Sequence, residues 1–342
     1  MKRRLIRVFH QMAFGAVLLA NTIPAHATFP GKNGRIAFVA GPDIYTMNVD
    51  GSDVKQLTNL GPDSGAFWES WSPDGKQIVF NEYHAPDFLG QLWLMNADGT
   101  NQRVLLSEAD FSNEIPSFTP DGTSIVFSRC RLDIEACALF QIEIGEGGLR
   151  PITNFHLGFQ DFSAQYSANN DLAFSGFSRQ GIISAIEFKG EQRSGLRRLT
   201  PAPFSAHHPD WSPDGKRIAF SSHCCNPQNE EIWTVNPRDS SLVRLTNNGK
   251  DYFSGPHDFH PSWSPQGNAI VFERDAPDFS SSGIFVMNSD GSRCAKVFAL
   301  GSSGHRNKIQ LRRDQAVNSR AMRRLKQIED GGALPQWGPA AN

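Results

Sequence analysis

The chain of 342 residues contains 33 Lys and Arg residues against 35 Asp and Glu residues, for a formal net charge of −2. This balance argues against nucleic acid as a partner, because binding to phosphates needs a basic surface. After the first 27 residues, no segment approaches the ~18 consecutive apolar residues of a membrane span. The length allows one large domain or two of ordinary size.

The N-terminus has the three parts of a secretory signal peptide. The cations Lys2, Arg3, Arg4 and Arg7 precede the apolar run Met12–Ala20, and Ala25-His26-Ala27 provides a small-x-small cleavage site. We therefore expect residues 1–27 to be removed and residues 28–342 to form a single periplasmic or secreted domain. Removal of the four cations lowers the formal net charge to about −6.

A repeat of about 45 residues organises the rest of the chain. Runs rich in β-branched and aromatic residues recur at equivalent places: Arg35–Val39, Gln77–Phe80, Ser124–Phe127, Asp171–Phe174, Arg217–Phe220 and Ala269–Phe272. Most of them follow a turn such as Ser72-Pro73-Asp74-Gly75. Proline presets φ in such a turn and glycine accepts a positive φ, so the chain reverses tightly.

Each run is followed by a second strand, a further tight turn and an outer strand. In one copy the second strand is Gln91–Met95 and the turn contains Asp98-Gly99, while Val54–Thr58 and Leu242–Thr246 are outer strands. An Asp-Gly pair between strands is a strong hairpin signal. Four antiparallel strands per unit, repeated six times, predict an all-β fold: a six-bladed β-propeller.

The first unit lacks an opening strand, and the C-terminus supplies a matching sequence. Pro335–Pro339 matches Pro209–Pro213. We expect residues 333–342 to form a closing strand that completes the first blade and the ring, which would remove exposed sheet edges. Aromatic residues at the repeat position are predicted to pack between blades: Trp71, Phe118, Trp211, Trp263 and Trp337.

A basic segment precedes the predicted closing strand. Residues 306–326 contain eight cations and one Asp, and Val317, Ala321, Leu325 and Ile328 form one apolar stripe at helical spacing. We predict a basic amphipathic helix within an insertion at residues 305–332. Three roles stay open for it: covering apolar surface, docking an acidic partner, or peripheral contact of residues 306–326 with anionic lipid of the envelope.

One copy of the repeat shows a family resemblance most clearly. Residues 209–220 read Pro-x-Trp-Ser-Pro-Asp-Gly-Lys-x-Ile-x-Phe, residues 232–236 read Ile-Trp-x-Val-Asn, and Leu245-Thr246 ends the outer strand. This pattern resembles the TolB-type β-propeller repeat, a relative of the WD-type repeat. The resemblance implies a periplasmic or envelope-associated role. TolB itself has an α/β domain ahead of its propeller, for which we expect no room in this chain.

The leading functional hypothesis is a non-catalytic, monomeric scaffold that binds a protein or peptide partner. The loops between second and third strands and the connections between blades share one face, and they are far more irregular than the turns of the other face. Irregular loops on a rigid scaffold are where binding usually resides. The predicted binding residues at the channel mouth on this face are Trp68, Asp161, His207, His208, His257, Asp258 and His260.

The alternative hypothesis is a metal-assisted carbohydrate-active enzyme. His208, His260 and Asp258 offer nitrogen and oxygen ligands for Zn²⁺ or Mn²⁺. Such a site would resemble propeller polysaccharide lyases with channel-facing histidines, whereas the structural alternative is hydrogen bonding at the channel rim. We expect no other cofactor and assign no catalytic residue. The sequence lacks the Gly-x-Ser-x-Gly, His-Glu-x-x-His and phosphate-loop motifs, which argues against those enzyme classes.

The five cysteines are compatible with disulfides in an exported chain. Cys130 and Cys137 are predicted to form a disulfide across one loop. The adjacent Cys224 and Cys225 could form a vicinal disulfide, staple a loop or stay as free thiols, and Cys294 is predicted to be unpaired.

Overall fold

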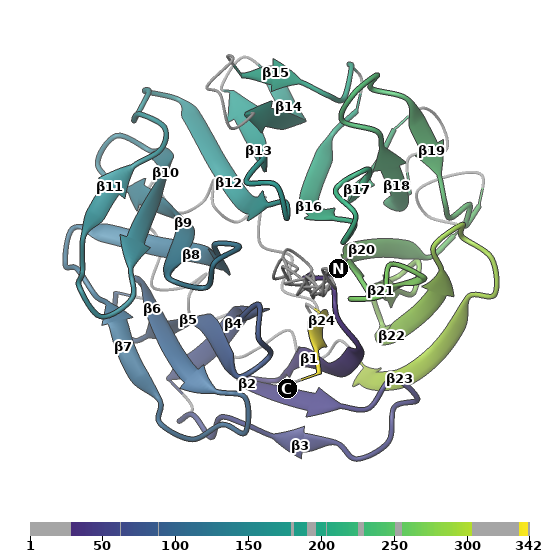
Figure 1. Ribbon diagram of the computed structural model, residues 1–342, viewed down its shortest axis with the longest axis horizontal. Coiled ribbons are helices and arrows are strands. Elements are labelled where there is room, and N and C mark those ends of the chain that lie inside the picture. Colours follow the sequence, from purple (N-terminus) through teal and green to yellow (C-terminus); the bar gives the residue numbers. More distant parts are fainter. Residues whose placement is uncertain are drawn as a thin grey trace, which may run out of the picture.

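The strands of the repeat are arranged around a central axis, with the first strands nearest the axis and the last at the rim (Figure 1). The computed structural model describes residues 29–61, 63–87, 89–178, 181–189, 196–202, 204–224, 229–249, 255–302 and 335–340. Across these ranges the regular elements are β-strands. No helix in them is long and apolar enough to cross a membrane. The fold is an all-β propeller, as predicted.

Four of the sheets have four strands each. The first joins β24 (Gln336–Pro339), β1 (Asn33–Ala40), β2 (Asp43–Met47) and β3 (Lys55–Gln56). The second contains β4 (Ser64–Trp71), β5 (Gln77–His84), β6 (Gly90–Asn96) and β7 (Arg103–Leu106). Another contains β16 (Ala206–Trp211), β17 (Ile218–Ser222), β18 (Glu231–Val235) and β19 (Leu242–Arg244). The fourth contains β20 (His257–Trp263), β21 (Ala269–Asp275), β22 (Ser281–Asn288) and β23 (Ala295–Ser302).

The fifth sheet has eight strands, so the prediction of six separate four-stranded blades is corrected to five sheets. One half contains β8 (Phe111–Phe118), β9 (Ser124–Arg131), β10 (Ala136–Glu143) and β11 (Leu149–Pro151). The other contains β12 (Phe159–Tyr166), β13 (Leu172–Ser178), β14 (Gly181–Lys189) and β15 (Arg197–Arg198). A parallel bridge between Cys137 and Gln160 joins the antiparallel halves. The repeat pattern predicts strand pairing within a unit, but it does not predict a bridge between units.

The two ends of the described chain meet in the first sheet. β24 pairs antiparallel with β1, which places Trp337 opposite Ile36 and Gln336 opposite Ala37. Gly338 lies so close to Trp71 of β4 that a Cβ atom at this position would stand 2.3 Å from Trp71 Cδ2. The proposed energetic role of this pairing in closing the ring stays a prediction.

Apolar residues of neighbouring sheets form the core. One cluster combines Ala37 and Ile44 of the first sheet with Trp71, Ile78 and Phe80 of the second. The aromatic residues at the repeat position are at most 6% exposed: Trp71, Phe118, Trp211, Trp263 and Trp337. This burial confirms their predicted packing role, and each large aromatic side chain removes about 150–250 Å² from water.

The Pro-Asp-Gly turns satisfy their own polar groups. Ser72 Oγ donates a hydrogen bond to Asp74 Oδ1 over 2.7 Å and accepts one from the Gln77 backbone N–H over 2.9 Å. Gly75 has a φ of 69°. Ser212 and Asp214 repeat this arrangement in the sheet of β16–β19. The turns therefore form as the sequence predicts.

The predicted disulfide between Cys130 and Cys137 is present and links β9 to β10. Cys224 is also disulfide-bonded, and Cys294 is exposed and outside any disulfide. Other predictions lie outside the described residues: the signal peptide at residues 1–27, Cys225, the helical insertion at residues 305–332 and its basic segment at residues 306–326.

Candidate functional site at the central channel

Five of the innermost strands share an irregularity next to the side chains that line the channel. The register of each of β4, β8, β12, β16 and β20 shifts by a bulge in mid-strand. At the bulges the backbone adopts positive φ values between 52° and 59°, at Trp68, Ile115, Ser163, His208 and His260. A left-handed conformation costs a non-glycine residue about 1–2 kcal/mol. Repeated strain of this kind on a rigid scaffold is a pointer to function.

These five side chains line one pocket at the centre of the disc. The pocket encloses about 460 Å³, part of it open solvent. All the innermost strands contribute to its wall, since Gln336 of β24 also lines it. The remaining lining residues are Glu69, Ser70, Pro116, Gln165, Pro209, Asp210 and Pro261. The repeat thus builds the frame of the pocket, while the residue types around it differ from unit to unit.

Three rings form the aromatic wall of the pocket. Trp68 stacks on His208 at a ring-centroid distance of 5.3 Å and meets His260 edge-on at 5.7 Å. The ring centroids of the two imidazoles are 4.3 Å apart. Burial lowers the pKa of His260 to about 3 and, with the neighbouring His260, holds the pKa of His208 well below its usual range. Both imidazoles are therefore neutral at pH 7.

Glu69 is the pocket residue that the sequence interpretation missed. It occupies the position that Pro209 and Pro261 hold in other copies of the repeat. Its side chain is buried, and neither carboxylate oxygen has a hydrogen-bond partner among the described residues. Burial raises the pKa of this carboxyl well above its usual range, and its own backbone amide offsets only part of the shift. The sequence does contain a signal for this residue, namely a glutamate where other copies of the repeat have proline.

Other predicted site residues have structural partners. Asp258 accepts hydrogen bonds from Arg274 Nε and Nη2 over 2.6 and 2.8 Å and from Asn248. His257 stacks on Phe279 at 4.8 Å. The structure therefore does not gather Asp258 with His208 and His260 into one ligand set, because the guanidinium of Arg274 occupies the carboxylate. A metal ion on those three residues stays a prediction.

Asp161 likewise has a partner outside the pocket, since Thr153 Oγ1 donates to its carboxylate over 2.7 Å. Thr153 Oγ1 also accepts the backbone N–H of Leu139 over 2.9 Å. Thr153 lies in the connection between β11 and β12, so these two bonds link that connection to β12 and to β10. Asp161 is not among the described residues that line the pocket.

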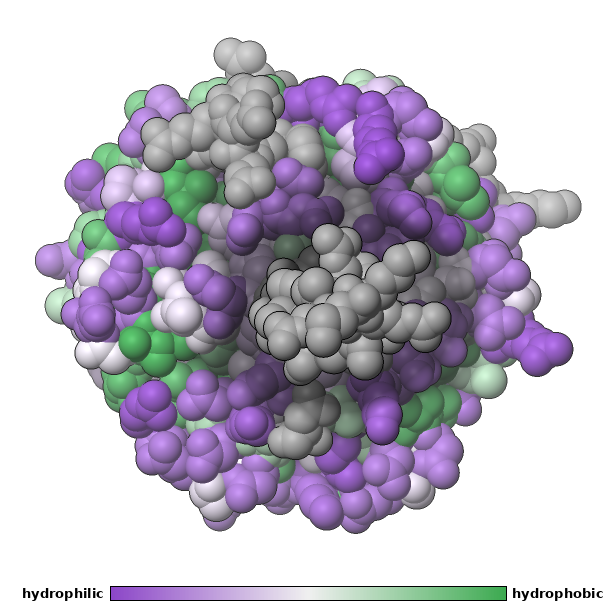
Figure 2. Space-filling view, in the orientation of Figure 1, coloured by the Kyte–Doolittle hydropathy of each residue, from purple (hydrophilic) through white to green (hydrophobic). Residues whose placement is uncertain are grey.

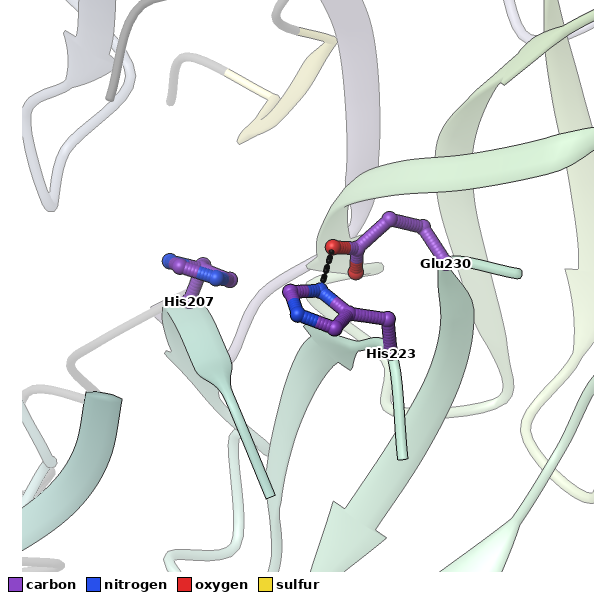
Figure 3. A group of neighbouring side chains, drawn as sticks. All are labelled: His207, His223 and Glu230. Atoms are coloured by element: carbon purple, nitrogen blue, oxygen red, sulfur yellow. Dashed lines mark hydrogen bonds and ion pairs between the residues drawn. The ribbon is translucent and has the colours of Figure 1, made fainter. Parts of the chain in front are cut away.

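His207 belongs to a second cluster beside the pocket. His207, His223 and Glu230 have potential ligand atoms that all lie within 4.8 Å of one another (Figure 3). His223 Nδ1 and Glu230 Oε1 are 2.6 Å apart, and this hydrogen bond raises the pKa of His223. Burial lowers the pKa of His207 to about 4. Within the described ranges, these three form the one such group of histidine, cysteine or acidic residues.

Comparisons with known proteins show what this propeller is similar to. No family model matches the chain. It is 25% identical over 223 residues to the Tol-Pal system protein TolB of Francisella tularensis subsp. mediasiatica, which covers 65% of this chain and 48% of that protein. The chain thus spans about half the length of the curated relatives it matches.

Two solved structures share the fold. The crystal structure of TolB from Acinetobacter baumannii has a TM-score of 0.64 at 20% identity, covering 90% of this chain and 67% of that one. The structure of a putative TolB from Agrobacterium tumefaciens has a TM-score of 0.62 at 20% identity, covering 80% of this chain and 90% of that one. The chain is thus similar in sequence to TolB proteins and shares the propeller fold of the two solved structures.

Proposed function

We propose that this chain is a non-catalytic scaffold of the cell envelope that binds a protein or peptide partner at its central pocket. The predicted signal peptide supports export to the periplasm. The matched relatives are named as proteins of the Tol-Pal system, which supports a role in an assembly of proteins. The irregular loops that we predict to form the binding face surround the same channel.

The buried carboxyl of Glu69 is the observation on which this proposal depends. Glu69 is 2% exposed and both its oxygens lack hydrogen-bond partners in the described part of the chain, although it lines an open pocket. A buried polar group without a partner costs about 1–3 kcal/mol. A bound ammonium or guanidinium group would supply the missing hydrogen bonds and charge. We therefore expect the partner to place a Lys, Arg or N-terminal amine beside Glu69.

The aromatic wall fits the same ligand chemistry. Trp68 is half-buried, so part of its ring stays accessible beside Glu69. The face of an indole ring attracts a cation with about 0.5–2 kcal/mol. The neutral imidazoles of His208 and His260 do not repel such a cation at pH 7. One wall of the pocket thus offers an acid and the other offers rings, which suits a basic or amphipathic peptide segment.

One face of the disc is suited to a polar interface. On the face seen in Figure 2, hydrophilic residues predominate around the middle of the disc, and hydrophobic residues form smaller areas farther out. A partner recognised here would depend on a few anchoring side chains in the pocket rather than on a broad apolar patch.

The test compares capture of envelope proteins by matched variants. Wild-type protein, a Trp68→Ala/Glu69→Gln double variant and a Val243→Ser control are immobilised and exposed to a bacterial envelope extract. Val243 is an exposed residue of the outer strand β19. We expect a specific partner, identified by mass spectrometry, that wild type and control retain and the double variant loses at least tenfold. Equal retention by all three proteins would refute the pocket as the binding site.

A further inference from the structure

We propose that His207, His223 and Glu230 form a binding site for one divalent transition-metal ion, with Zn²⁺ as the best match, beside the central pocket. None of the three residues lines that pocket. The site is also distinct from the predicted set of His208, His260 and Asp258. It therefore stands or falls independently of the proposed partner binding.

The register of the sheet brings the three residues together. His207 of β16 pairs with Ser221 of β17. Ser222 at the end of β17 pairs with Glu231 at the start of β18, so His223 and Glu230 begin and end the loop between these strands. Side chains two residues apart lie on the same face of a strand. His207 and His223 therefore share one face, and Glu230 reaches it from across the loop (Figure 3).

The donor set and its spacing suit zinc. Two histidines and one glutamate are an established ligand combination for Zn²⁺, with a fourth position left for water. Ligands at about 2.0–2.1 Å from the metal in a tetrahedron are roughly 3.4 Å apart. The potential ligand atoms here lie within 4.8 Å of one another, so side-chain rotations that move these atoms by about 1 Å complete the site. The proton between His223 and Glu230 would be displaced by the metal.

The glutamate is held in place by its backbone. The Glu230 N–H donates to His257 Nδ1 over 3.3 Å, and its carbonyl accepts the N–H of Asp258 over 2.8 Å. Glu230 Oε2 is buried and has no hydrogen-bond partner within the described ranges. A fixed carboxylate with an unsatisfied oxygen beside two imidazoles is a strong site for a cation, since a bound ion satisfies that oxygen.

The histidines differ in their roles. Ser205 Oγ lies 3.0 Å from His207 Nε2, and an outer partner of this kind fixes the ring of a metal-binding histidine. The His223 side chain is 44% exposed, which gives an ion access from solvent. The site thus combines a held imidazole, a buried carboxylate and an accessible imidazole.

The test measures Zn²⁺ binding to chelator-treated, tag-free protein by calorimetry and by metal analysis after dialysis. We expect one ion per chain, and at least a tenfold weaker affinity in His223→Gln and in Glu230→Gln. The matched control is His84→Gln, because His84 Nε2 contacts Glu82 Oε1 over 3.0 Å in strand β5 and no third ligand among the described residues completes that pair. The control should bind as wild type does.

Co²⁺ provides a second readout that does not depend on affinity alone. Cobalt in a four-coordinate nitrogen and oxygen site gives intense visible absorption bands, which His207→Gln should weaken. Circular dichroism confirms that each variant is folded, and a variant that fails to fold is replaced by Ser205→Ala, expected to weaken binding while keeping all three ligands. Substoichiometric binding, or equal binding by wild type and the three ligand variants, would overturn the proposal.

Discussion

The Pro-Asp-Gly turns and the central channel are built from the same repeat but treat their polar groups in opposite ways. In the turns, Asp74 and Asp214 accept hydrogen bonds from the Ser that precedes each of them by two residues. In the channel, the Glu69 carboxylate and His208 Nδ1 are buried, and the described residues offer neither of them a hydrogen-bond partner. The turns are thus complete within the chain, whereas the channel leaves hydrogen-bonding capacity for something outside it.

Backbone conformation separates the two regions in the same manner. Positive φ in the turns falls on glycines such as Gly75 and Gly215, where it costs little. In the channel it falls on Trp68, Ile115 and His208, where it is strained. Strain and unsatisfied groups are tolerated where they serve recognition. The difference indicates that stability is concentrated in the repeat positions and function in the bulges.

Deletion of residues 334–342 should have the largest effect on stability. It removes β24, its pairing with β1 and the buried Trp337. Loss of a buried tryptophan alone costs about 3–5 kcal/mol, and at about 2–4 °C per kcal/mol the melting temperature should fall by about 6–20 °C. Deletion of residues 341–342 is the control for a shortened C-terminus. An unchanged melting temperature in the longer deletion would disprove the closing role of β24.

Two tryptophan substitutions compare the regions directly. Trp211→Ala should lower the free energy of unfolding by about 3–5 kcal/mol, because this ring is fully buried. Trp68→Ala should change it by about 1 kcal/mol or less, because the side chain is half-buried and its backbone is already strained. Partner binding should respond in the reverse order. Chemical denaturation measures the effect on stability, and the capture assay measures the effect on binding. Similar destabilisation by both substitutions would contradict the separation of stability at the repeat positions from function at the bulges.

Glu69→Gln should change how stability depends on pH. The folded-state pKa of this carboxyl is raised above 4.5, so the native state holds a proton that the unfolded chain releases as the pH rises. Wild type therefore loses stability relative to Glu69→Gln above about pH 4.5, by at most about 1.4 kcal/mol per pH unit. Denaturation of both proteins from pH 4 to pH 8 measures this slope. Parallel curves would show that Glu69 has an ordinary pKa.

Most of the fold follows from the sequence because the repeat position fixes both pairing and burial. Trp211 and Trp263 are buried as their places in the repeat require, and the loop between β9 and β10 is short enough for the predicted disulfide. The bridge between Cys137 and Gln160 was not predictable in this way. It depends on the distance between neighbouring units, which local patterns do not encode.

The candidate site was predictable only in part. His208 and His260 depart from the repeat, and both line the pocket. Asp258 lies directly opposite Arg274 in the register of β20 and β21, so the sequence could not reveal this partner, and its grouping with the two histidines stays a prediction. Glu69 stands out because the fold buries its carboxyl without a hydrogen-bond partner among the described residues, and His223 and Glu230 stand out because the fold brings them together. Residue spacing in the sequence predicts neither feature.

The smallest expected effects come from exchanging glycine between the regions. Gly122→Ala should destabilise by about 1 kcal/mol, because alanine is strained at its φ of 70° even though the added Cβ has only ordinary contacts, the nearest 3.4 Å away. Ser163→Gly should stabilise by about 0.5 kcal/mol, because relief of the strain at φ 53° exceeds the entropy cost of glycine. Denaturant midpoints measure both changes. If Ser163→Gly destabilises as much as Gly122→Ala does, the bulges store no strain, and the conformation at the channel is simply the one that these residues prefer.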